Sequence, residues 1–220
     1  VSKIAYEAPD NFKERIVASK ISGDDNGFSA NTAEQAKFDF YNNNIDLNNR
    51  IVSPIADYAF SYYKYKLLGT FYDENKFLIN KIEVISRRPK DNTFNGIIYI
   101  VEDQWTIYGL ELTTLGENIN VPVIEQLTFN QDFTYEPSSG DWIKRSQSLD
   151  FSFGFFGFKG NGRFLANYTN YDFKPQFDKK YFGPEVLSFE LDANKKDSTY
   201  WNAKRPVPLT LEETKNYIKK

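Results

Sequence analysis

Apolar and polar residues alternate along most of this chain, a pattern typical of β-strands with one buried and one solvated face. In residues 124–135 the apolar positions after Ile124 are Leu127, Phe129, Phe133 and Tyr135, and the intervening positions are polar. Residues 149–155 repeat the pattern with Leu149, Phe151, Phe153 and Phe155. Further strand-like runs, at 63–72, 77–85, 94–101, 105–114 and 163–173, are separated by turn residues as in an antiparallel meander. Shorter strands are predicted at 4–8, 12–21, 37–47 and 186–191.

Glycines at 154, 157, 160 and 162 follow the second aromatic run. Glycines in antiparallel sheets often mark bends, so we expect a strongly curved sheet. The predicted fold class is therefore mainly β: a curved antiparallel sheet, like a half-barrel, with a few short helices. The eight apolar side chains of the two runs would line its concave side. If nothing fills that side, it forms a binding site for an acyl chain or an apolar peptide; the alternative is that other elements fill it.

Only short helices are predicted. Ser53 as a cap, Pro54 at the first helical position and Asp57 in the first turn favour a helix over 54–62. Its residues Ile55, Ala59 and Tyr62 would then face the concave side. A helical turn is expected over 195–202, and a capping box at 210–213 predicts a final helix. The segment 23–27 favours a tight turn over a calcium loop, because it lacks the ligand spacing of such loops.

The composition argues against most catalysis. The 220 residues include no His and no Cys, but 15 Tyr, 20 Phe and 3 Trp. No imidazole base, thiol nucleophile or His/Cys metal site is available. The remaining acid–base candidates are carboxylates: Glu102 and Asp103 in a predicted loop, and Glu111 and Asp150 on solvated strand faces. No motif joins them into a glycosidase pair, so we expect no enzyme, no metal and no cofactor.

Trp105, Trp142 and Trp201 could stack on a sugar or a base, but packing against the sheet is the more common role of such side chains. The net charge of −3, with a pI near 5.2, gives no support for a nucleic-acid partner. No apolar run approaches the roughly 20 residues of a membrane-spanning helix.

The pattern changes after Pro175, so we expect a curved β domain over residues 1–175 and an extension with short helices over 176–220. The chain opens on Val1 without an initiator Met and closes on Lys219-Lys220. We therefore expect a piece of a longer protein that continues downstream.

A set of short strings, taken in order, carries a family resemblance. They are EAPDNFKE (7–14), ASKISG (18–23), VSPIAD (52–57), YKYKLLGTF (63–71), YIVED (99–103), FDKKYFG (177–183), ANKKDS (193–198), YW (200–201) and RPVPLT (205–210). This order resembles a domain-of-unknown-function family of Bacteroidota outer-membrane proteins. Its members carry an N-terminal carboxypeptidase-regulatory-like domain, which has no peptidase chemistry, and a C-terminal membrane β-barrel.

The resemblance implies a periplasmic domain at the outer membrane, with its own downstream barrel as partner and other outer-membrane subunits or lipid as further partners. The layout also resembles the lipoprotein-carrier (LolA-like) fold. In that fold a helix and a strand precede the point where this chain begins, which implies that upstream elements complete the β domain. Two functions follow: a non-catalytic scaffold or docking module, or a carrier that holds an acyl chain or apolar peptide in the concave sheet. An enzyme acting on envelope glycans is a third and weaker possibility. The triplet 197–199 also resembles the O-glycosylation pattern of Bacteroidota envelope proteins, which implies a modified Ser198.

Overall fold

The structure is a computed structural model that describes residues 1–19, 32–33, 37–205, 208 and 214. It forms two compact units, one of residues 1–37 with 174–220 and one of residues 38–173. The first 37 residues group with the C-terminal segment rather than with the large sheet, because an N-terminal strand pairs with a strand near residue 188.

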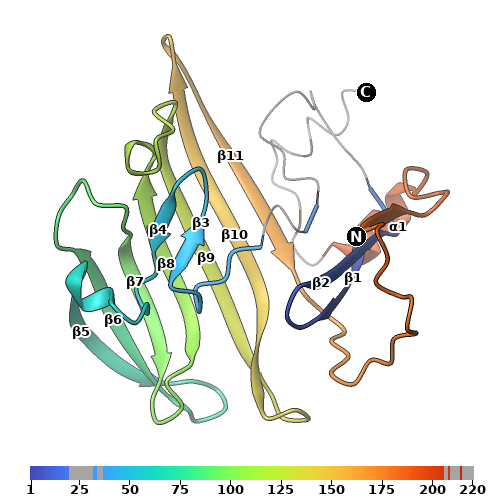
Figure 1. Cartoon of the computed structure of the whole chain (residues 1–220), viewed down its shortest axis with the longest axis horizontal. Helices are drawn as coiled ribbons and strands as arrows, with labels where there is room; N and C mark the ends of the chain where they lie inside the picture. Colours follow the sequence, from blue (N-terminus) through green and yellow to red (C-terminus); the bar gives the residue numbers. More distant parts are fainter. Residues whose placement is uncertain (20–31, 34–36, 206–207, 209–213, 215–220) are drawn as a thin grey trace. The chain divides into compact units, whose positions relative to one another are not determined.

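The second unit is built on a seven-stranded antiparallel sheet, shown in teal to orange in Figure 1. Its strands are β5 (Tyr63–Tyr72), β6 (Leu78–Ser86), β7 (Asn95–Val101), β8 (Ile107–Leu115), β9 (Ile124–Glu136), β10 (Asp141–Phe155) and β11 (Phe158–Asn167). Each strand pairs with the next one along the chain, so β5 and β11 are the two edges. The prediction of a mainly β fold with an antiparallel meander is confirmed.

The segment before this sheet adds a small hairpin of β3 (Asn44–Asp46) and β4 (Arg50–Val52). The predicted helix over 54–62 is wrong, because only a 3-10 turn, η2 (Ala59–Ser61), forms there. Its backbone bonds join residues three apart, as in the bond from the Ala59 N–H to the Ala56 carbonyl. Ala59 is buried as expected, but Ile55 is 37% exposed and does not belong to the core.

Two physical reasons explain the missing helix. The hydroxyl of Ser53 donates to the Phe40 carbonyl at 2.6 Å and makes only a long contact, 3.4 Å, with the Ile55 N–H. In addition, four of the six residues at 58–63 are aromatic, a class with modest helix propensity, and Tyr63 already belongs to β5.

The core of this unit lies on one face of the sheet. The buried side chains that fill it include Phe38, Phe40, Ile45, Ile51, Val84, Phe94, Ile98, Leu110, Leu112 and Phe129. A second 3-10 turn, η3 (Gly116–Ile119), connects β8 to β9. Burying one large apolar side chain contributes about 1.5–3 kcal/mol, so this cluster is the main source of stability in the unit.

The other unit contains β1 (Ser2–Glu7) and β2 (Asn11–Ile16), which are antiparallel, and β12 (Leu187–Phe189), which is parallel to β2. The helix α1 (Ser198–Lys204) begins where Asp197 accepts a hydrogen bond from the Tyr200 N–H at 2.9 Å. The predicted turn at 23–27 and the capping box at 210–213 lie outside the described residues. No helix in the described ranges is long and apolar enough to cross a membrane.

Candidate functional site

The strand register brings most of the predicted apolar site residues together. Leu127 pairs with Phe151, and Phe129 pairs with Leu149, so these four side chains share one face of β9 and β10. Further along the two strands, Phe133 pairs with Lys144 and Tyr135 with Trp142. Phe153 pairs with Ile124 at the other end. The side chain of Phe155 lies outside what the structure describes.

The middle of this face is filled by the chain itself. Phe129 is 1% exposed, and its ring centroid lies 5.0 Å from that of Phe38, 5.9 Å from that of Phe40 and 5.7 Å from that of Phe94. Leu127 is buried as well. At these two positions the side chains pack in the core, and the other described members of the predicted set are half-buried.

Phe151 and Phe153 lie against glycines of the edge strand β11. Phe151 pairs with Gly162 and Phe153 with Gly160. A Cβ atom at Gly162 would come within 2.1 Å of the Phe151 ring, and one at Gly160 within 2.4 Å of the Phe153 ring. Two of the glycines that we interpreted as bends therefore make room for aromatic rings on the neighbouring strand.

A second aromatic cluster lies at the opposite end of β9 and β10. The ring of Phe77 lies 5.0 Å from that of Tyr135 and 5.2 Å from that of Trp142, and Tyr108 lies 5.6 Å from Trp142. The Trp142 indole donates to Gln104 Oε1 at 2.6 Å. Trp142 thus packs within the protein, whereas Trp105 is 70% exposed. Trp201 belongs to α1 in the other unit, where it is half-buried.

A buried polar cluster interrupts the apolar face, and sequence reasoning missed it. Gln131 and Gln147 pair across β9 and β10, and each is 2% exposed. The Phe38 carbonyl accepts from Gln131 Nε2 at 2.7 Å and from Lys144 Nζ at 2.9 Å. These bonds hold the segment before β3 on the sheet. The available signal was a glutamine at the one position of β9 that breaks the apolar series between Phe129 and Phe133.

Lys144 makes the stability of this unit depend on pH. Burial lowers its pKa to about 8, partly opposed by the charge of Asp39, whereas the unfolded chain titrates near 10.5. Between these values the unfolded chain binds more protons, so the free energy of unfolding rises with pH, by on the order of 2 kcal/mol. Lys144→Met should remove this rise and stabilise the protein below pH 8, because Gln131 still bonds the Phe38 carbonyl.

Urea unfolding of the wild type and of Lys144→Met, at about pH 7 and about pH 10, measures this effect. If the free energy of unfolding of the wild type falls over this pH interval, or rises equally in Lys144→Met, the effect does not come from Lys144.

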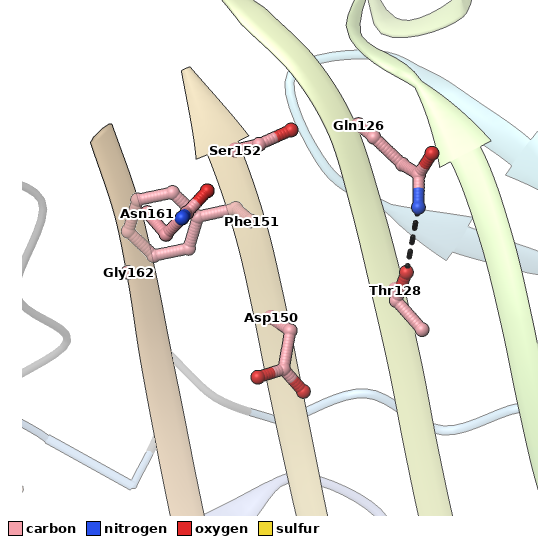
Figure 2. Close-up of a pocket in the computed structure, with 7 residues that line it drawn as sticks. All are labelled: Gln126, Thr128, Asp150, Phe151, Ser152, Asn161 and Gly162. Carbon is pink, nitrogen blue, oxygen red and sulfur yellow. Dashed lines mark hydrogen bonds between the residues drawn. The ribbon is translucent and has the colours of Figure 1, made fainter. Parts of the chain in front are cut away.

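The opposite face of β9–β11 is polar and carries a shallow groove of about 230 Å³ (Figure 2). Five residues of this face line it, namely Gln126, Thr128, Asp150, Ser152 and Asn161, together with Phe151 and Gly162, whose positions in the strand register belong to the apolar face. Many of these groups bond to one another or to close neighbours. Gln126 donates to Thr128 at 3.2 Å, and Asp150 accepts from Arg163 and, at 3.1 Å, from Ser148. The groove is smaller than the ~300–1,000 Å³ of typical small-molecule pockets.

The acidic candidates do not converge on one site. Glu102 and Asp103 lie in the turn after β7, where Glu102 accepts a hydrogen bond from Asn80. Glu111 pairs with Asn130 and is exposed, on the same solvated face as Asp150. Within the described part of the chain, no three acidic side chains gather as a metal site.

Taken together, the fold and the site define a class of protein: an antiparallel β-meander domain whose apolar face is packed by its own chain around Phe129. More specifically, the chain belongs to the family of unknown function DUF5686, whose model matches residues 1–171. No curated protein and no solved structure matches the chain.

Proposed function

We propose that this domain is a non-catalytic docking module at the periplasmic face of the outer membrane. The observation that carries the proposal is a contrast between two surfaces of the sheet. The middle of its apolar face is filled by Phe38, Phe40 and Phe94, whereas the edge strand β5 exposes large apolar side chains. An exposed apolar surface on a sheet edge is a typical site of protein association.

Strand β5 has the properties that strand addition requires. Its exposed apolar side chains are Leu67 (59%), Leu68 (44%), Phe71 (40%) and Tyr72 (70%). Over the described residues it pairs only with β6, and it contains no proline. Backbone groups on its outer side can therefore bond to an added strand. Lys64 and Lys66, which are exposed near its start, keep this edge soluble in the absence of a partner.

The carrier function has less support. Leu127 and Phe129 are core residues, and the groove on the opposite face is polar and small. The half-barrel curvature remains part of our proposal, supported by register shifts in the β5–β6, β7–β8 and β9–β10 pairings. Such irregularities bend a strand and increase the twist of its sheet.

The location and the partner that we propose for this domain rest on the family resemblance. We propose that β5 docks on the protein's own downstream membrane barrel or on another subunit of an outer-membrane complex. Ser198 is exposed at the start of α1, which is compatible with O-glycosylation there.

Site-specific photo-crosslinking in the full-length protein, in its native membrane, tests this function. A photoreactive amino acid at Leu67 on β5 should give one defined product, identified by mass spectrometry as the downstream barrel or a partner subunit. The same probe at Leu165, which is 42% exposed on the opposite edge strand β11, is the matched control and should give none. Equal products at both positions, or none at Leu67, would reject docking through β5.

A further inference from the structure

The hairpin of β10 and β11 carries a feature that the docking function does not explain. Phe155 and Phe158 form its last pair, so only Phe156 and Gly157 make the turn. Phe156 is 88% exposed and Phe158 is 79% exposed. In Figure 1 the tip of this hairpin extends beyond the ends of the neighbouring strands of the sheet. Two large aromatic side chains thus stand in solvent at the most projecting point of the hairpin.

The backbone of the turn makes this choice of residue unusual. Phe156 has φ of 46° and Gly157 has φ of 84°. Tight hairpin turns with two positive φ values favour Asn, Asp or Gly at the first position, because a bulky side chain is strained there. A phenylalanine at this position neither eases the turn nor packs in a core. A strained residue whose large apolar side chain faces solvent is grounds for a functional hypothesis.

We propose that the tip, residues 155–158, is a lipid-binding element that inserts Phe156 and Phe158 into the surface of a bilayer. The charge distribution favours lipid over a protein partner. The tip residues 155–158 include no charged side chain, so the tip can enter an apolar phase without carrying a charge into it. The next charged residue, Lys159, forms an ion pair with Glu125 at 3.0 Å, just behind the tip.

The shape of the tip also favours insertion into a bilayer. A two-residue turn at the end of two paired strands is a narrow, convex wedge, which can enter a bilayer surface without a preformed pocket. This proposal is independent of docking through β5, which lies at the other edge of the sheet. An experiment that rejects lipid binding by the tip therefore does not reject docking through β5, and the reverse also holds.

Co-sedimentation of the full chain with phosphatidylcholine vesicles tests the proposal. The tip variant is Phe156→Asn with Phe158→Thr, in which Asn tolerates the positive φ and Thr suits a strand. This variant should keep the fold and lower the vesicle partition coefficient by roughly 10- to 100-fold, as expected if the two Phe rings are only partly buried in the bilayer surface. Binding of the wild type should persist at high salt, because insertion is apolar.

Trp105→Asn is the matched control. Trp105 is also an exposed aromatic residue with positive φ, at 56°, but it lies in the β7–β8 turn at the opposite end of the sheet. Its replacement should leave vesicle binding unchanged. The proposal is overturned if the wild type does not bind vesicles, if the folded tip variant binds as well as the wild type, or if Trp105→Asn weakens binding equally. If the wild type does not bind vesicles, a protein surface is the remaining binding partner for the tip.

Discussion

Replacing Phe129 with alanine should destabilise the sheet unit by about 3–5 kcal/mol, the usual effect of removing a large aromatic side chain from a packed core. Phe129 is 1% exposed and contacts the rings of Phe38, Phe40 and Phe94, which come from two other segments of the chain. The variant therefore loosens the segments that cover the sheet as well as the sheet itself. Urea unfolding followed by near-ultraviolet circular dichroism measures the change.

Thr128→Ala is the control for this experiment, because Thr128 is the neighbour of Phe129 on the solvated face. Its hydroxyl lies 3.1 Å from that of Thr113, and its loss should cost less than about 1 kcal/mol. If Phe129→Ala costs no more than Thr128→Ala, the apolar face is not packed as described.

Tyr63→Phe should cost about 2–4 kcal/mol, although it removes a single oxygen atom. The Tyr63 side chain is fully buried, and its hydroxyl donates to the Val52 carbonyl and accepts from the Phe94 N–H at 3.0 Å. Phenylalanine would leave both backbone groups buried without a partner, at about 1–3 kcal/mol each. The same burial raises the pKa of Tyr63 well above its usual range.

Tyr65→Phe is the matched comparison on the same strand. Its hydroxyl makes one hydrogen bond, to the Pro54 carbonyl at 2.7 Å, from a half-buried position. We expect its loss to cost about 0.5–1.5 kcal/mol. Equal effects of the two substitutions in chemical unfolding would show that the Tyr63 hydroxyl does not hold β4 and the segment before β7 together.

Local alternation was sufficient to predict the large sheet. In β9 the apolar residues recur with a period of two from Leu127 to Tyr135, interrupted only by Gln131, and pairing with β8 and β10 preserves this alternation. The register therefore keeps the face that holds Phe129 distinct from the one that holds Thr128. Hairpins between consecutive strands followed from the turn residues alone.

What covers the sheet could not be predicted, because it depends on contacts between distant residues. Phe38 and Phe40 alternate as in a strand, and the pattern predicted one over 37–47, but only Asn44–Asp46 is extended and paired. The two rings instead pack on Phe129, some 90 residues away. The parallel pairing of β12 with β2 is equally non-local, and it changes the division of the chain into units.

The helix predicted over 54–62 failed for a related reason. Its cap, Ser53, is buried and bonds the Phe40 carbonyl, a tertiary contact that no local signal reveals. The polar cluster of Gln131 and Gln147 was missed because polar residues at single inward positions are averaged out of an alternation pattern. The cluster stabilises the fold by bonding the Phe38 carbonyl, and Phe38 lies near Gln131 only in the folded chain.

Titration with a fluorescent fatty acid tests the central claim most directly, namely that the apolar face is packed by the chain itself and holds no ligand. The tip variant Phe156→Asn/Phe158→Thr is the protein to use, so that only the sheet is probed. We predict no saturable binding at micromolar probe. Saturable one-to-one binding that is weakened by Phe151→Asp but not by Ser152→Asp would contradict the account and identify the domain as a carrier.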